Sequence, residues 1–269
     1  MFLDSIVKKV GEKPGKTLAV FAGIHGNEKA GVLGLDFLSS NLVVEAGTVY
    51  FVYANPPAIS ENVRQVNLNL NRLFHRELVG SDYEFARAQE LMDILDSCDA
   101  LLDLHSYNSQ SGEAFVIAEN NAKDFFSKLD VSIVAQGFGD MGYGTDDYMY
   151  RNGKIGICLE CGTSNKFEEF VPFAVKSTKQ FLSHYGAISE IIESAQRSQK
   201  HYKVKAMHKK YSETFAFSKT FLDFEVLPVD KPFIIDGSVS VTAELGDIIM
   251  FPRPDVSIGE EVCIVAKQL

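Results

Sequence analysis

The sequence predicts an α/β fold in which a mostly parallel or mixed sheet is covered by helices and is followed by a small all-β domain. Short apolar runs alternate with helical patterns up to about residue 199, as expected for such a sheet. From about residue 201 the chain is rich in aromatic and β-branched residues and in short turns, which is typical of strands. Its 269 residues, 46% of them hydrophobic, suffice for one large domain or two modest ones. We therefore expect an α/β domain over residues 1–199 and a β domain over residues 200–269.

The expected strands of the first domain are short apolar runs bounded by turns or polar residues. They are "TLAVFA" at 17–22, "TVYFVYA" at 48–54, "ALLDLH" at 100–105, "AFVIAE" at 114–119, "SIVAQ" at 132–136 and "IGICLE" at 155–160.

The expected helices show amphipathic patterns, and some carry end signals. One covers about 28–40, and another covers about 82–97, where Ser81 and Glu84 form the S-x-x-E pattern of a capping box. A long amphipathic helix in "KFEEFVPFAVKSTKQFLSHYG" stops at Gly186, and a further helical stretch runs to about residue 199. These helices complete the expected α/β domain.

The charge of the chain limits its partners. Lys plus Arg number 26 against 36 Asp plus Glu, and the formal net charge of −10 argues against a nucleic-acid or anionic-membrane partner. No apolar run is long enough to span a bilayer, and the opening residues lack a signal-like apolar region, so we expect a cytoplasmic protein. We expect a small-molecule substrate as the partner, and a homodimer is compatible with the sequence.

The four cysteines are too few and too scattered for a disulfide framework, so we expect reduced thiols. Cys158 and Cys161 form a C-x-x-C, a spacing also found in redox sites and zinc knuckles. The chain has no second C-x-x-C, and the pair lies at the end of an apolar run rather than at a helix start. We therefore expect both thiols to pack in the interior.

The stretch "GIHGNE" places His25 and Glu28 three residues apart where an apolar run ends. In one interpretation Asn27 caps the next helix, Glu28 lies in its first turn and His25 is a polar loop residue. In the other, His25 and Glu28 bind a metal ion at the carboxyl end of a strand, the usual place for a site in an α/β sheet.

The run "ALLDLHS" favours the metal interpretation, because it places His105 at the end of another expected strand. The alternative is a loop histidine that hydrogen-bonds to Asp103. Together His25, Glu28 and His105 form the three-ligand set of a catalytic zinc site that keeps one coordination position open. The sequence therefore predicts one Zn²⁺ per chain, held by these three residues.

A zinc hydrolase also needs a base, and Glu160 at the end of "IGICLE" is the candidate. A carboxylate at the end of a buried strand is costly unless it is paired or functional, and partial burial moves its pKa towards neutrality. The alternative role is an ion pair with a nearby Lys or Arg.

An unusually long loop at 55–80 supplies the remaining candidates. Arg64 could polarise the carbonyl that is attacked. Asn71 and Arg72 could bind a substrate carboxylate, since the Arg fork matches a carboxylate bidentately. Taken singly, each is equally compatible with an ordinary surface residue.

The motifs "GIHGNE", "NLNRLF", "DLHS" and "GICLECG", in this order, resemble the succinylglutamate desuccinylase/aspartoacylase family, a branch of the zinc-carboxypeptidase fold. The segments "TFAFSKTFLDF" and "IIMFPRPDVSIG" resemble the small β domain that follows the catalytic domain in succinylglutamate desuccinylases. The resemblance implies a zinc-carboxypeptidase-like mixed sheet and the same roles for the metal ligands, Glu160, Arg64, Asn71 and Arg72.

The chain departs from the family pattern at several points. Asn69 stands where the family usually has Asp, which affects a carboxylate that braces the loop rather than a ligand. The segment "SYNSQSGEAF" after His105 matches neither the desuccinylase nor the aspartoacylase pattern for acyl-group choice. The family arginine that binds the acyl side corresponds to Arg151, although its spacing to Glu160 is one residue off.

The resulting functional prediction is a zinc-dependent hydrolase that cleaves the amide bond of an N-acyl amino acid by attack of metal-bound water. A metallocarboxypeptidase acting on a peptide C-terminus is the alternative enzyme. The alternative that is not an enzyme is a metal-dependent binding protein without catalysis. The sequence leaves the acyl group and the amino acid open.

Overall fold

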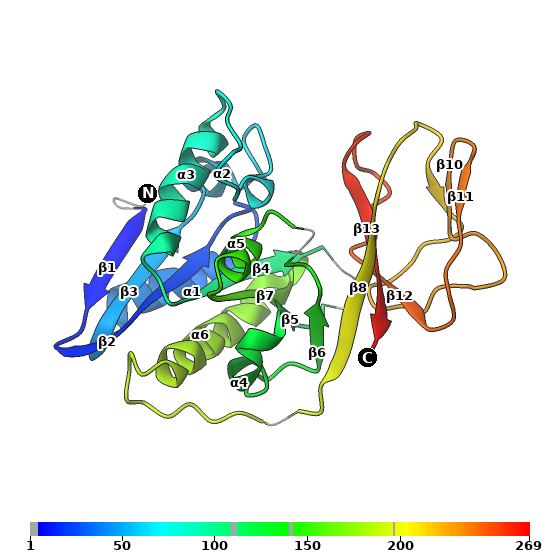
Figure 1. Ribbon diagram of the computed structural model, residues 1–269. Helices are drawn as coiled ribbons and strands as arrows, with labels where there is room; N and C mark the ends of the chain where they lie inside the picture. Colours follow the sequence, from blue (N-terminus) through cyan, green and yellow to red (C-terminus); the bar gives the residue numbers. More distant parts are fainter. Residues whose placement is uncertain (1–4, 109–111, 140–141, 196) are drawn as a thin grey trace.

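The computed structural model describes residues 5–108, 112–139, 142–195 and 197–269 (Figure 1). Within them one large mixed sheet has the strand order β1-β3-β2-β4-β7-β5-β6-β8-β13-β12. These strands are β1 (Ile6–Val10), β2 (Lys13–Ala22), β3 (Ala46–Tyr53), β4 (Ala100–Tyr107), β5 (Phe115–Ala118), β6 (Ile133–Gln136), β7 (Ile155–Thr163), β8 (Lys200–Lys209), β12 (Asp247–Met250) and β13 (Glu261–Gln268).

The centre of this sheet is parallel: β2 pairs with β3 and with β4, and β4 pairs with β7. Antiparallel pairs lie further out, such as β1 with β3 and β5 with β7. A small separate sheet consists of β9 (Ala216–Phe217), β10 (Ile234–Asp236) and β11 (Val239–Val241). The predicted mixed α/β architecture is confirmed.

Helices cover both faces of the sheet. They are α1 (Lys29–Asn41), α2 (Pro56–Glu61), α3 (Tyr83–Asp96), α4 (Lys123–Phe126), α5 (Thr145–Arg151) and α6 (Phe167–His184). Successive residues of β2 point to opposite faces, so Val20 packs in the cluster that contains residues of α1 and α6, and Phe21 packs with residues of α3. Helices α1 and α6 approach closely at Gly34, where a Cβ atom would lie 3.2 Å from the Cβ of Ala174.

The predicted capping box at Ser81 and Glu84 is wrong. Helix α3 has Asp82 at its N-cap, without a side-chain cap hydrogen bond. The buried carboxylate of Glu84 instead accepts hydrogen bonds from the backbone N–H groups of Val66 (3.2 Å) and Asn67 (3.0 Å). This carboxylate therefore braces the long loop, a long-range role that the local pattern does not reveal.

The predicted helical stretch up to residue 199 is also wrong. Helix α6 ends at His184, Gly186 has a positive φ of 78°, and the described residues from 187 to 199 contain no helix. The carbonyl of Ala187 accepts hydrogen bonds from the N–H groups of Glu45 (2.8 Å) and Ala46 (3.3 Å). These contacts bind the segment to the start of β3, and this tertiary pairing overrides its helical pattern.

The C-terminal residues extend the large sheet. Strand β8 begins at the predicted domain boundary and pairs in parallel with β6, while β13 pairs with β8 and β12 with β13. In Figure 1 these strands, coloured yellow to red, stand beside the N-terminal part. The division into residues 1–199 and 200–269 stays a prediction, because the hydrogen-bonded sheet continues across it.

All four cysteines are buried and free. Cys158 and Cys161 lie three residues apart on β7, so they face opposite sides of the sheet and pack in different hydrophobic clusters. As for membranes, none of the helices in the described ranges combines the length and apolar character needed to cross one.

Candidate active site

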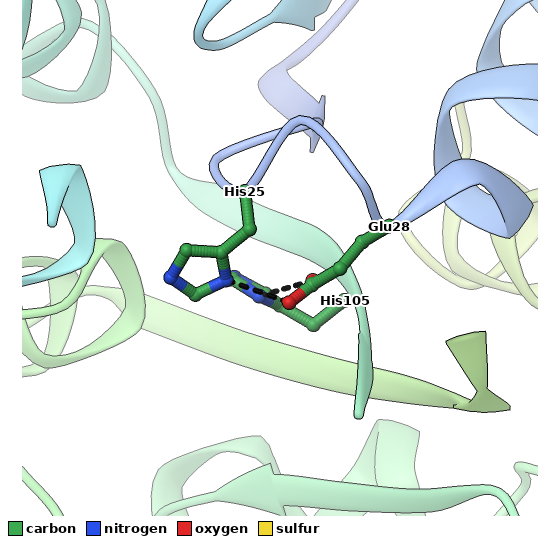
Figure 2. Close-up of side chains that lie close together, drawn as sticks. All are labelled: His25, Glu28 and His105. Carbon is green, nitrogen blue, oxygen red and sulfur yellow. Dashed lines mark hydrogen bonds and ion pairs between the residues drawn. The ribbon is translucent and has the colours of Figure 1, made fainter. Parts of the chain in front are cut away.

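The ends of β2 and β4 bring three predicted metal ligands together, although His105 follows Glu28 by 77 residues. His25 and Glu28 lie in the turn between β2 and α1, and His105 lies on the neighbouring parallel strand β4. The carboxylate of Glu28 faces both imidazole rings in Figure 2, 2.7 Å from Nδ1 of His25 and 3.0 Å from Nδ1 of His105. All three side chains are buried.

This group has donor atoms close enough together to hold a metal ion. One ligand atom from each of His25, Glu28 and His105 lies within 4.8 Å of the others. Each histidine also has an acceptor at its Nε2 atom: Asn69 Oδ1 at 3.0 Å from His25 and Asp103 Oδ2 at 3.2 Å from His105. An Nε2–H that donates to such an acceptor leaves Nδ1 free to bind a metal, which is the usual arrangement of a metal-binding histidine.

The contact of Asn69 clarifies one departure from the family pattern. Its amide oxygen accepts from Nε2 of His25 and also from the N–H of Asn71 at 3.1 Å. Both are acceptor roles, which an amide oxygen performs as well as a carboxylate oxygen does, although without its charge. Asn69 therefore orients His25 and braces the loop.

The electrostatics of the three residues favour a bound cation. Burial lowers the pKa of His25 to about 4. Burial also opposes the charged form of His105, but the carboxylates of Asp103 and Glu28 outweigh it and raise the His105 pKa well above its usual value. For Glu28, the two histidines outweigh the effect of burial and lower the pKa. The buried carboxylates of Asp103 and Glu28 thus require a nearby positive charge. A divalent ion can supply this charge, as can a proton on histidine.

Glu160 lies beside this group, because β7 is next to β4 and Glu160 is directly opposite His105 in the strand register. Its side chain is 6% exposed, and its Oε2 atom has no hydrogen-bond partner within the described residues. Burial raises the pKa of Glu160 to about 8. The predicted alternative, an ion pair with Lys or Arg, is not found in the part of the chain that the structure describes. A carboxyl group in this state can accept and return a proton near neutral pH.

The long loop contributes Arg64, Asn71 and Arg72 to the same cavity, which has a volume of about 380 Å³. Nη1 of Arg64 lies 3.4 Å from Oε1 of Glu28. Arg72 is engaged by Glu261 on β13: its Nε donates to Oε1 at 2.7 Å and its Nη2 donates to Oε2.

Arg151 is the predicted site residue that does not line this cavity within the described ranges. Its guanidinium donates to the carbonyls of Phe74 (3.1 Å), Gly139 (3.4 Å) and Gly142. These contacts tie α5 to two loops. They account for the side chain without a ligand, so its predicted role at the acyl group gains no support.

Several cavity residues were not predicted from the sequence. The C-terminal part supplies Met207, Phe251, Arg253, Glu261 and Ile264, and α5 supplies Asp146 and Asp147. Burial raises the pKa of Asp147 to about 6. The pKa of Asp146 is raised well above its usual value by burial and by the neighbouring charge of Asp147. The adjacent acidic residues Asp146 and Asp147 could have indicated a functional site. At the start of a helix, however, acidic residues are equally well explained by a favourable interaction with the helix dipole.

Comparisons with known proteins identify the family of the chain. The family model described as the succinylglutamate desuccinylase/aspartoacylase catalytic domain matches residues 14–185. Aspartoacylase from Rattus norvegicus is 31% identical over 140 residues, which are 45% of this chain and 43% of the rat protein. An N-acyl-aromatic-L-amino acid amidohydrolase (carboxylate-forming) from Xenopus tropicalis is 31% identical over 166 residues, 54% of each protein. The chain thus spans about half the length of these relatives.

Solved structures extend the likeness in fold to the C-terminal part. Succinylglutamate desuccinylase from Vibrio cholerae has a TM-score of 0.85 and 20% identity, covering 98% of this chain and 85% of that chain. At this identity the match establishes a shared fold. Because the family model covers more than half of the 269 residues, the chain belongs to the succinylglutamate desuccinylase/aspartoacylase family.

Proposed function

We propose that the protein is a zinc-dependent amidohydrolase that cleaves the amide bond of an N-acyl amino acid. The observation that carries this proposal is the buried group of His25, Glu28 and His105 with the carboxyl of Glu160 on the adjacent strand. The relatives named aspartoacylase and N-acyl-aromatic-L-amino acid amidohydrolase support the same reaction class.

His25, Glu28 and His105 would hold the zinc ion. Zinc, when bound, acts as a Lewis acid on the amide carbonyl and makes water more acidic. Glu160 takes the proton of the attacking water on its carboxylate and passes it to the leaving nitrogen. Its position in an apolar, buried environment supports this role, since a raised pKa balances proton uptake and release.

The residues of the long loop act on the substrate. Arg64, close to Glu28, donates hydrogen bonds to the carbonyl oxygen as negative charge develops there. Asn71 and Arg72 belong to the side of the cavity that recognises the amino-acid part. Arg72 is already paired with Glu261, so direct recognition of a substrate carboxylate by the Nε edge of Arg72 requires that pair to open.

The size of the cavity, about 380 Å³, supports a small-molecule substrate. Residues of β8 and β13 and of the turn before β13 form one of its walls, among them Met207, Arg253 and Ile264. Apolar side chains on this wall suit an uncharged acyl or side-chain group.

The test is an assay of the zinc-loaded protein on N-acetyl-L-phenylalanine, N-acetyl-L-aspartate and N-succinyl-L-glutamate, with short peptides assayed separately as alternative substrates. We expect release of the free carboxylic acid from at least one acyl amino acid, abolished by removal of the metal and restored by zinc. Release of amino acids from the C-terminus of peptides alone would support the carboxypeptidase instead. No turnover on either class would support the non-catalytic binding protein.

A further inference from the structure

Three arginines line the cavity within the described residues, and they differ in how their charge is compensated. Arg64 has Glu28 at 3.4 Å, and Arg72 has the carboxylate of Glu261. Arg253 donates from Nη2 to the backbone carbonyl of Glu261 at 2.9 Å and forms no ion pair with a described residue. Among the described residues, Arg253 is therefore the cavity arginine that has no carboxylate at ion-pair distance.

The backbone before Arg253 is held in an unusual conformation. Phe251 has a φ of 52°, in the left-handed region that is strained for a bulky residue. Its N–H donates to Oδ1 of Asp223 at 2.6 Å, and its ring packs on Tyr107 with the centroids 5.9 Å apart. Pro252 follows, and the N–H of Arg253 donates to the carbonyl of Val262 at 2.7 Å. These contacts maintain a strained turn that presents Arg253 to the cavity.

The surroundings of Arg253 disfavour its charge. Burial, followed by the nearby charge of Arg64, lowers the pKa of Arg253 below its usual value, and the Glu261 carboxylate only partly offsets this. A guanidinium that is partly withdrawn from water is stabilised by a hydrogen-bonded anion. A planar carboxylate matches the fork of guanidinium N–H groups.

We propose that Arg253 is a specificity-determining residue that binds the free carboxylate of the substrate, while Glu261 keeps Arg72 paired beside it. The inference rests on the proposed hydrolysis of N-acyl amino acids and adds the residue that selects acids over neutral amides. This inference gives the C-terminal part of the chain a role in substrate recognition. Arg253 lies outside residues 14–185, the segment that matches the catalytic-domain model.

The experiment measures binding by calorimetry in the zinc-loaded Glu160→Gln protein, where turnover does not interfere. The probes are N-acetyl-L-phenylalanine, N-acetyl-L-leucine and N-acetyl-L-glutamate, each compared with its α-carboxamide. The variants are Arg253→Gln, Arg253→Lys and the matched control Arg197→Gln, since Arg197 is an exposed arginine outside the cavity.

We expect at least one acid to bind more tightly than its carboxamide. Arg253→Gln should weaken binding of that acid about ten- to a hundredfold and leave the carboxamide nearly unchanged, because a charge-assisted contact is lost. Arg253→Lys should keep part of the preference for the acid, and Arg197→Gln should keep all of it.

Three results would overturn the inference: no acid preferred over its carboxamide, an equal loss for acid and carboxamide in Arg253→Gln, or the same loss in Arg197→Gln. A parallel turnover assay of the wild-type protein separates this question from the proposed function. If the acids bind through Arg253 but are not hydrolysed, the reaction is wrong and the carboxylate site stands.

Discussion

Arg72 on the long loop and Glu261 at the start of β13 form a two-pronged ion pair, although they are 189 residues apart in the sequence. A third contact, from Nη1 of Arg72 to the carbonyl of Asn71 at 2.8 Å, fixes the guanidinium against its own loop. The pair joins the loop beside the proposed metal ligands to the C-terminal strands. It therefore couples the two parts of the chain at the edge of the cavity.

A double-mutant cycle measures this link. We expect Arg72→Ala, Glu261→Ala and the double variant to give a coupling energy of about 1–3 kcal/mol in urea unfolding, because the pair is two-pronged and partly buried. The exposed pair of Arg76 and Asp93 is the control and should give less than about 1 kcal/mol. Equal values for the two pairs would mean that the Arg72 pair adds no special stability.

The metal site is tested by removing one ligand. His105→Ala should lose tight zinc binding, since only two of the three proposed ligands remain, whereas His201→Ala should retain it. Elemental analysis of the purified proteins, with circular dichroism to confirm folding, is the measurement. Full zinc content in folded His105→Ala protein would place the metal elsewhere.

The acceptor at His25 should matter for metal affinity. Asn69→Ala removes the oxygen that accepts from Nε2 of His25, and we expect zinc affinity to fall about ten- to a hundredfold. Asn69→Asp keeps the acceptor and should bind zinc at least as tightly as the parent. Competition with a zinc chelator gives the affinities, and an unchanged affinity in Asn69→Ala would argue that the ring needs no such partner.

Glu160 is expected to move a proton and not to bind the metal. Glu160→Gln should retain zinc and the fold, but lower kcat on the best N-acyl amino acid by at least roughly a hundredfold, the lower range for general acid–base catalysis. Steady-state kinetics with elemental analysis of the same sample tests both parts. Near-normal turnover would remove Glu160 from the mechanism.

Asp147 should make stability depend on pH. Burial raises its pKa from the usual 3.8 to about 6, so the folded state favours the protonated form. The stabilisation is complete below about pH 4 and is lost as pH rises through about 6. Asp147→Asn avoids this loss, so its free energy of unfolding relative to the parent should rise by about 1–3 kcal/mol between pH 4 and pH 7. A difference between Asp147→Asn and the parent that stays flat over this pH range would contradict the prediction.

The sequence by itself determined the class of fold and the composition of the candidate metal site. Apolar runs of strand length predicted β2, β4 and β7. At or just beyond the ends of these runs lie His25, His105 and Glu160. Because the carboxyl ends of adjacent parallel strands meet at one edge of a sheet, local patterns were enough to predict that these side chains lie together. Their chemical roles remain proposals for the experiments above.

Only the tertiary structure decided which partners the polar side chains take. Glu84 does not form the predicted capping box, because its carboxylate accepts hydrogen bonds from N–H groups of the long loop. The segment after Gly186 is not helical, and it contacts the start of β3 instead. Arg72 pairs with Glu261. Arg253 lines the cavity after a strained turn at Phe251. Periodicity and capping patterns describe neighbours within a few residues, whereas these contacts depend on packing between segments that are distant along the chain.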